Sequence, residues 1–276
     1  MKYFSVIWSS LKRKKTRSIL TILSILVAFI LYGYLSAIRL GFDSGVEVAG
    51  VDRLVMQHKV SLIQFLPESY QSRIEQVEGV DSVTHGTWFG GIYQEPMNFF
   101  SQFPVEIEEF LDMFPEYLLS DEEKKAWLDT RTGAVVGRGT AKRFGWKIGD
   151  RIPLQATIWT RKDESPTWDF DLVGIYDRAE TTTDTTLFFF RYDYFQEARS
   201  FGSGEVGWYW IRVDDPENSA TIARELDQLF ANSPAETKTQ PEAAFIQGFA
   251  NQIGDIGLIM AAIMSAVFFT ILLVAG

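Results

Sequence analysis

Residues 19–38, ILTILSILVAFILYGYLSAI, form an uncharged stretch of 20 residues near the start of the chain. At about 1.5 Å of rise per residue, a helix of this length spans roughly 30 Å, the thickness of the hydrocarbon core of a bilayer. A basic cluster precedes the stretch, and such clusters stay on the cytoplasmic side of a membrane. The pattern therefore predicts a first transmembrane helix over residues 18–41, with a cytoplasmic N-terminus.

Residues 1–17 predict an amphipathic, basic segment at the cytoplasmic membrane surface. Phe4, Ile7, Trp8 and Leu11 recur at helical spacing, so they share one face of a helix that can lie in the interface. A frayed N-terminus with the same charges stays open as an alternative. The residues expected to contact the membrane surface and set the topology are Trp8, Lys12, Arg13, Lys14, Lys15 and Arg17.

A cleaved signal peptide is the alternative interpretation of residues 19–38. The apolar run is longer than the roughly 7–15 residues of a signal-peptide core, and no convincing A-x-A cleavage site follows it. We therefore expect an uncleaved helix that remains in the membrane.

Residues 257–276 also lack charge and predict a second transmembrane helix over residues 256–276, where the chain ends. Small residues recur every four positions in both stretches, and this spacing lets helices approach each other closely. Ordinary membrane-helix composition explains the same spacing equally well. The residues expected to pack the helices together are Gly33, Ala37, Gly257, Ala261 and Ser265.

Charge separates the start of the chain from the large segment between the two apolar stretches. Residues 1–41 hold seven of the 26 basic residues and none of the 36 acidic ones, which leaves the rest of the chain with a net charge of −17. Such an acidic segment, residues 42–255, is unsuited to nucleic acid, because phosphate binding needs a basic face. The chain has no cysteine, which excludes zinc–thiolate sites, iron–sulfur clusters and cysteine nucleophiles.

The segment 42–255 alternates between strand and helix patterns, as is typical of an α+β domain. Ser120 precedes a helix pattern and Glu123 follows three residues later, which predicts a capping box. The strands are expected at 53–66 (one long or two short), 80–93, 99–103, 151–158, 168–172, 187–190 and 207–213, and the helices at 67–77, 106–114, 120–128 and from Pro216 onward. Residues 134–154 are expected to run as strand, glycine turn, short helix, turn and strand, and Gly137 and Gly139 favour a turn rather than a dinucleotide-binding loop.

The sequence offers little catalytic chemistry. No P-loop motif occurs, so ATP binding through such a loop is not expected. His58 and His85 are more often structural than metal ligands, and Ser82 near His85 has no nucleophile elbow to support a hydrolase. Trp88, Phe89 and Tyr93, beside the pair Gly90-Gly91, are expected in the core, with an exposed docking loop as the alternative. We therefore predict no enzyme activity, no cofactor and no metal site.

Five stretches in this order, between two predicted spans, resemble the MacB/FtsX-type ABC transporter permeases. They are WSSLKRKKTRSILTILSI, GAVVGRGTAKRFGWKIGDRIPL, FDLVGIYD, LDQLFANSPAETKTQPEAAF and IGDIGLIMAAIMSAVFFTILL. The resemblance implies two α/β lobes in an extracytoplasmic domain inserted between the first two of four membrane helices. Because the chain ends within the second predicted helix, we expect it to be truncated or completed by a companion chain.

The resemblance also implies a function and its partners. The expected partners are a separate cytoplasmic ATPase that binds the ATP, a second permease copy, membrane lipid and a periplasmic adaptor protein. ATP hydrolysis is then coupled to movement of the outer domain for export or extraction of a substrate at the inner membrane. The alternative is an FtsX-like scaffold that regulates an extracytoplasmic cell-wall hydrolase, and a membrane-tethered enzyme ranks last.

Overall fold

The computed structural model describes residues 50–179 and 183–246, together with single positions between 15 and 33. The chain divides into two compact units, one of residues 1–46 with 246–276 and the other of residues 47–245. The second unit holds nearly all of the described residues. The predicted boundaries at 17, 41 and 255 and the second predicted membrane helix lie outside the described ranges and stay predictions.

The described positions between 15 and 33 are helical and exposed. Eight of them carry large apolar side chains: Ile19, Ile22, Leu23, Leu26, Val27, Phe29, Ile30 and Tyr32. Among the residues that the structure describes, no helix is both long enough and apolar enough to cross a membrane.

The first part of the domain, here called the terminal lobe, comprises residues 50–86 and 205–246. Its sheet contains β1 (Arg53–His58), β3 (Val80–Gly86), β12 (Trp208–Val213) and β13 (Thr237–Pro241), in the order β13-β1-β12-β3 with every pair antiparallel. Helices η1 and α3 (Glu68–Tyr70 and Gln71–Ile74) connect β1 to β3, and η2 and α8 (Pro216–Asn218 and Ser219–Leu229) connect β12 to β13. This order is that of the ferredoxin-like split βαβ motif.

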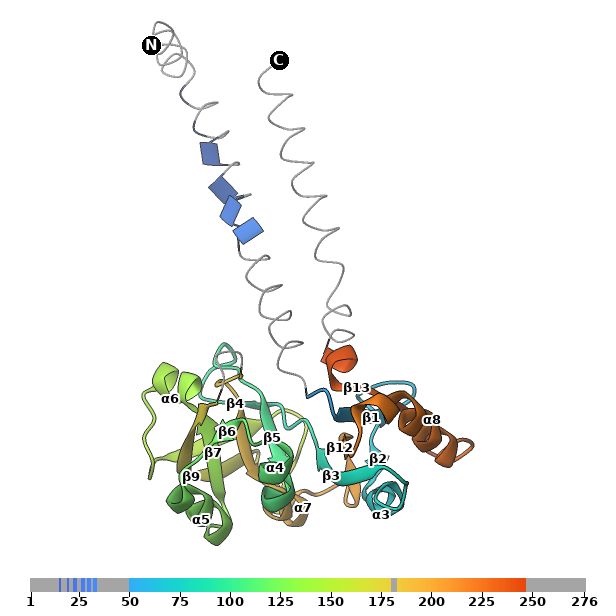
Figure 1. The fold of residues 1–276 in the computed structure, drawn as a ribbon. Helices are drawn as coiled ribbons and strands as arrows, with labels where there is room; N and C mark the ends of the chain where they lie inside the picture. Colours follow the sequence, from blue (N-terminus) through green and yellow to red (C-terminus); the bar gives the residue numbers. More distant parts are fainter. Residues whose placement is uncertain are drawn as a thin grey trace, which may run out of the picture. The chain divides into compact units, whose positions relative to one another are not determined.

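The second part, the inserted lobe, comprises residues 87–204 and interrupts the motif between β3 and β12 (Figure 1). Its sheet has the order β4-β8-β9-β7-β10-β5, and β6 pairs with β9. The strands are β4 (Gly91–Ile92), β5 (Gln102–Val105), β6 (Tyr117–Leu118), β7 (Gly133–Gly137), β8 (Arg151–Ala156), β9 (Thr167–Arg178) and β10 (Phe188–Arg191). The helices are α4 (Ile107–Met113), α5 (Asp121–Asp129), α6 (Arg138–Phe144) and α7 (Tyr192–Ala198).

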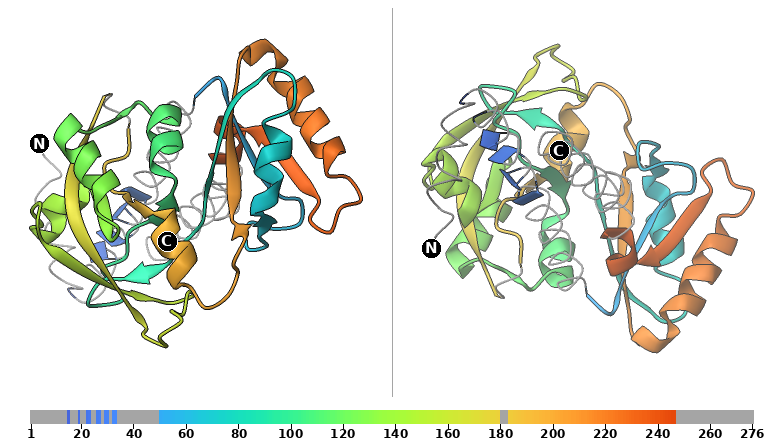
Figure 2. Two further views of the ribbon diagram at one scale, coloured as in Figure 1. Left: turned by 90° about the horizontal axis from the view of Figure 1, so that it is seen from below. Right: turned by 90° about the horizontal axis from the view of Figure 1, so that it is seen from above.

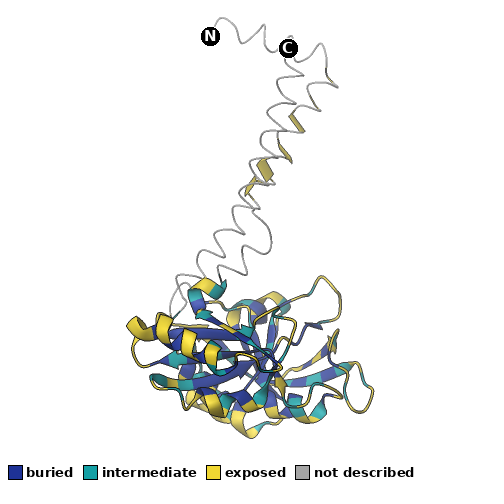
Figure 3. Cartoon of the chain, turned by 90° about the vertical axis from the view of Figure 1, so that its right-hand side faces the viewer, coloured by how far each residue is buried: buried dark blue, intermediate teal, exposed yellow. Residues whose placement is uncertain are grey.

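Two short strands, β2 (Leu66–Pro67) and β11 (Glu205–Val206), pair where the chain returns to the terminal lobe. Figure 2 shows both lobes with their helices from below and from above. Buried residues concentrate on the strands in the interior of the domain (Figure 3). One hydrophobic cluster contains residues of both lobes, such as Leu54 and Phe170. The predicted α+β fold with two α/β lobes is confirmed.

Most predicted elements are present near their expected bounds. The alternating pattern of residues 151–158 pairs with that of 168–172, and Leu154 lies opposite Trp168 in the antiparallel β8–β9 hairpin. Residues 53–66 form two short strands rather than one long strand. The strand expected at 99–103 begins only at Gln102, which pairs with Phe188 of β10. The Gln102 side chain accepts a hydrogen bond from Gly91 N and donates one to Gly91 O, at 2.7 and 3.0 Å.

Glycine is required at Gly137, where β7 turns into α6. A Cβ atom at this position would overlap the backbone carbonyl of Thr185, and Gly137 N donates a hydrogen bond to Leu187 O at 2.9 Å. Two backbones therefore approach each other closely at Gly137. The glycine turn expected at this position is replaced by α6, which begins at Arg138 directly after β7.

The predicted capping box is present at the start of α5. Glu123 N donates to Ser120 Oγ, and Ser120 N donates to the Glu123 carboxylate at 2.9 Å. A second Glu123 oxygen accepts from Ile175 N on β9 at 2.9 Å, so the cap also attaches α5 to the sheet. Burial raises the pKa of Glu123, but the hydrogen bonds from Ile175 and Ser120 outweigh burial and lower this pKa overall.

We expect Ser120→Ala to lower the free energy of unfolding by about 1 kcal/mol, because it removes the cap acceptor. Thermal unfolding at neutral pH measures the loss, and Ser72→Ala, at an exposed serine, is the control with little change. Because the pKa of Glu123 is lowered in the folded state, Glu123 stabilises the fold at neutral pH. This stabilisation is lost as the pH falls through the folded pKa. An equal loss in both variants would contradict the assignment.

Candidate inter-lobe junction

Arg53, at the start of β1, is buried at 7% exposure and contacts both lobes. Its Nε donates to Glu242 Oε2 at 2.7 Å within the terminal lobe, and its Nη2 donates to Glu116 Oε1 at 2.8 Å in the inserted lobe. Its Nη1 donates to Met113 O at 3.2 Å, and the guanidinium lies 4.6 Å from the ring centroid of Phe114. One buried cation therefore holds two carboxylates from different lobes.

Glu242 connects this cation to both ends of the described domain. Its Oε2 also accepts a hydrogen bond from Gly50 N at 2.9 Å, and Glu242 itself lies just after β13, four residues before the last described residue. Burial raises the pKa of Glu242, although the charge of Arg53 opposes this. We call Gly50, Arg53, Glu116 and Glu242 the root cluster.

A second arginine links the lobes through β12. Arg212 donates from Nε to Asp81 on β3 at 2.6 Å and from Nη2 to Asp112 on α4 at 2.5 Å. Its Nη1 also donates to the backbone oxygen of Asp112 at 2.9 Å. This pair is more exposed than the root cluster, so it contributes less to stability.

Aromatic side chains continue the contact between the lobes, and we call them the aromatic seam. Consecutive ring centroids along the seam lie 5.2–5.8 Å apart, a separation at which aromatic pairs attract each other. From one end to the other, the seam contains Phe99, Trp88, Phe103, Trp208, Trp210 and Phe114.

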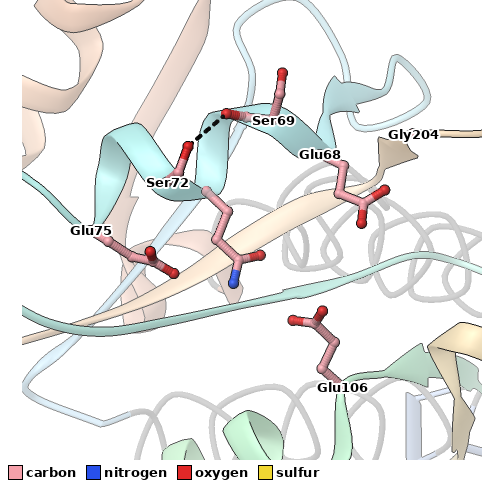
Figure 4. A pocket seen from close by; sticks show the side chains of 7 residues that line it. Glu68, Ser69, Ser72, Glu75, Glu106 and Gly204 are labelled. Atoms are coloured by element: carbon pink, nitrogen blue, oxygen red, sulfur yellow. Dashed lines mark hydrogen bonds between the residues drawn. The ribbon is translucent and has the colours of Figure 1, made fainter.

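An acidic cleft of about 590 Å³ opens beside the lobe contact, with Glu68, Glu75 and Gln71 on the terminal lobe and Glu106 and Gly204 on the inserted lobe. Figure 4 shows the side chains of Glu68 and Glu106 pointing toward the same space. Glu68 accepts hydrogen bonds from Tyr192 Oη and Gln196 Nε2 at 3.1 and 3.2 Å, both on α7. This carboxylate is therefore an inter-lobe tie rather than a free ligand.

His85 lies fully buried at the end of β3, with Nε2 3.5 Å from the Glu106 carboxylate across the lobe contact. The interaction with His85 is the largest cause that lowers the pKa of Glu106. The His85 ring also packs edge-on against Tyr192 at 4.3 Å. Ser82 makes no hydrogen bond with His85 among the described contacts, so no nucleophile–base pair forms there. The His85 ring therefore packs within the contact between the lobes.

Of the residues predicted to contact the membrane or to pack its helices, the structure describes Lys15 and Gly33. Both are helical and exposed, and a Cβ atom at Gly33 would meet no atom within 4 Å. The remaining predicted residues lie outside the described ranges and stay predictions: Trp8, Lys12, Arg13, Lys14, Arg17, Ala37, Gly257, Ala261 and Ser265. No group of three potential metal-ligating side chains occurs in the described part of the chain.

The aromatic residues beside Gly90-Gly91, predicted either in the core or on an exposed docking loop, differ in their exposure. Phe89 is fully buried in the core, and Tyr93 packs partly buried against the same cluster. Trp88 keeps 37% of its surface exposed. The core interpretation is right for Phe89, whereas Trp88 presents one edge to solvent.

Comparisons with known proteins identify a curated relative of this chain and solved structures of similar fold. No family model matches the chain. An uncharacterized ABC transporter permease of Methanocaldococcus jannaschii is 24% identical over 245 residues, which cover 82% of this chain and 57% of that relative. The chain thus spans little more than half the length of this curated relative.

Solved structures are similar in fold. The periplasmic region of MacB from Actinobacillus actinomycetemcomitans matches with a TM-score of 0.52 and 13% identity, over 74% of this chain and 94% of that one. The extracellular domain of the noncanonic ABC-type transporter YknZ from Gram-positive bacteria gives a TM-score of 0.49 and 10% identity, over 68% and 99% of the two chains. The described domain has the fold of the MacB periplasmic region, and the predicted resemblance is confirmed at this level.

Proposed function

We propose that the chain is part of the permease subunit of an ABC transporter of the mechanotransmitting type. In this proposal, a separate cytoplasmic ATPase binds and hydrolyses ATP, two permease copies assemble in the inner membrane, and the described domain moves outside the membrane to export or extract a substrate. The MacB-like fold and the curated permease relative support the proposal that the described domain is the extracytoplasmic part of a permease. The exposed apolar side chains between Ile19 and Tyr32 support a membrane helix before it.

The root cluster is the observation that carries the mechanical part of the proposal. Gly50 and Glu242 lie where the chain enters and leaves the described domain, and Arg53 joins both to Glu116 of the inserted lobe. Because all of these groups share one buried cation, a displacement of either chain end acts on both lobes together. A domain that only displayed a static surface would not need this connection between its ends and its far lobe.

Membrane topology is tested by labelling single cysteines, since the chain has none of its own. Lys125 lies exposed on α5, and Ser10 lies in the segment predicted to be cytoplasmic. We expect Lys125→Cys to react with an impermeant maleimide in intact cells and Ser10→Cys to react only after the cells are permeabilised. Labelling of Ser10→Cys alone in intact cells would overturn the proposed orientation.

Coupling is tested on the full-length gene product, purified together with its ATPase. Spin labels on Lys125→Cys of the two permease copies report the separation of their inserted lobes. We expect this separation to change by several ångströms between the nucleotide-free state and the state trapped with ATP and vanadate. An unchanged distance, together with specific binding of a cell-wall hydrolase by the domain, would favour the alternative of a regulatory scaffold.

A further inference from the structure

A short loop beside α6 exposes large apolar side chains that are held in place. Met97 is 85% exposed and Phe99 is 47% exposed. Arg143 at the end of α6 donates from Nη2 to Met97 O and from Nη1 to Phe99 O, both at 3.1 Å. Trp88, which is partly exposed, stacks on Phe99 with ring centroids 5.8 Å apart. Two hydrogen bonds and a ring stack therefore fix an apolar surface that faces solvent.

This apolar surface lies beside the most basic stretch of an otherwise acidic domain. Residues 138–147 contain four basic residues and no acidic one. Arg138 is neutralised by Asp177, its Nη2 lying 2.6 Å from Asp177 Oδ2. In the described part of the chain, Lys142, Arg143 and Lys147 are exposed and have no carboxylate within ion-pair distance.

Two acidic residues border the surface without neutralising it. Asp150 is exposed and its carboxylate accepts a hydrogen bond from Lys147 N at 2.7 Å, and Glu95 is exposed on the loop. Asp177 is shared, because the hydrogen bond from Arg138 and the nearby charge of Lys142 both lower its pKa. The four basic side chains of residues 138–147 therefore outnumber Asp177, Asp150 and Glu95 by one. We call Trp88, Met97, Phe99, Lys142, Arg143 and Lys147 the α6 face.

The chain length limits how far the α6 face lies from a membrane, if the proposed topology holds. Figure 1 shows α6 at the same end of the domain as β1 and the last described residues. The first predicted span ends at residue 41, and eight residues separate it from Gly50. Even when fully extended, this segment reaches only about 30 Å, so Gly50 lies within that distance of the end of the predicted span.

We propose that the α6 face rests on the outer membrane surface and binds anionic phospholipid headgroups. The inference rests on the proposed topology and goes beyond the proposed transport function. Exposed tryptophan, phenylalanine and methionine insert into the headgroup region, while lysine and arginine beside them attract anionic lipid. The helix C-terminus favours Lys142 and Arg143 electrostatically, but this effect gives no reason for the exposed Met97 and Phe99.

The test uses the whole chain in nanodiscs that contain a nickel-chelating lipid as a relaxation agent. A spin label on Met97→Cys reports contact with the membrane surface, and the same label on Lys125→Cys, at the exposed surface of α5, is the matched control. In discs of mixed phosphatidylglycerol and phosphatidylcholine, we expect relaxation at position 97 to exceed that at position 125 about threefold or more. In phosphatidylcholine alone, the excess is expected to fall.

The double variant Lys142→Gln with Lys147→Gln examines headgroup binding, and Arg143 is kept because it braces the loop. We expect the excess relaxation at position 97 to fall in the anionic discs to the value seen in phosphatidylcholine alone. Equal relaxation at positions 97 and 125 would overturn the inference. Shielding of position 97 from water without contact with lipid would also overturn it, because such shielding indicates a protein partner. If the chain does not enter the discs, the proposed topology fails instead.

Discussion

Replacing Arg53 by Met is expected to lower the free energy of unfolding by about 3–5 kcal/mol, because it leaves two buried carboxylates without their cation. Glu116 and Glu242 both lie within 2.8 Å of the Arg53 guanidinium, and their side chains are largely buried. Methionine keeps an unbranched apolar side chain at this position, so the loss reports the guanidinium with its charge, its hydrogen bonds and its contact with the Phe114 ring. For a domain of this size, the melting temperature should fall by roughly 10 °C.

The pH dependence of this loss distinguishes a buried charge from lost packing. Burial already raises the pKa of Glu242 above its usual value, and removing Arg53 takes away the charge that opposes this shift. When the pKa of a group is higher in the folded state than in the unfolded state, its contribution to stability is present at low pH. This contribution is lost as the pH rises through the folded pKa. The deficit of the variant should therefore be larger at about pH 8 than at about pH 5.

Arg151→Gln is the matched control, because Arg151 makes an exposed ion pair with Asp169 at 3.4 Å. Exposed pairs contribute little, so the control should change the melting temperature by no more than about 1–2 °C. A deficit in Arg53→Met that is the same at both pH values would contradict the role given to Glu242. If Arg53→Met loses no more stability than Arg151→Gln, the root cluster does not connect the two lobes mechanically.

Local patterns in the sequence predicted the elements of the domain well. Ser120 and Glu123 are three residues apart, so their capping box is visible in the sequence and is present in the structure. The β8–β9 hairpin is equally local, because its buried side chains alternate on both strands and only residues 157–166 separate them. Such features depend on a few neighbouring residues.

The arrangement of the lobes depends on pairs that are far apart in sequence. The pattern predicted strand, helix and strand over residues 53–93, but nothing local indicated that β12, α8 and β13 return to complete this sheet. Arg53 lies 63 residues from Glu116 and 189 from Glu242, so no spacing rule connects them. The one local signal is that the charged residue Arg53 begins the apolar strand RLVM. This signal does not identify the partners of Arg53.

Phe89→Ala and Trp88→Ala are expected to differ strongly in stability although the residues are neighbours. Phe89 is fully buried, and its ring lies 5.1 Å from Phe190 and 5.4 Å from Trp168 by ring centroid. Truncation leaves a cavity among these rings, so it should cost about 3–5 kcal/mol. Trp88 is partly exposed and contacts Phe99 and Phe103 at one side, so its loss should cost about 1 kcal/mol.

Chemical denaturation followed by far-ultraviolet circular dichroism measures both variants, since this signal does not depend on the tryptophan that is removed. Phe89→Leu is the control, because it keeps most of the apolar volume and should recover most of the lost stability. The sequence allowed either a core or a docking role for this aromatic pair, and the structure assigns one residue to each environment. Equal losses in the two alanine variants would mean that Trp88 is also a core residue, and its exposed edge would then be no evidence for a surface contact.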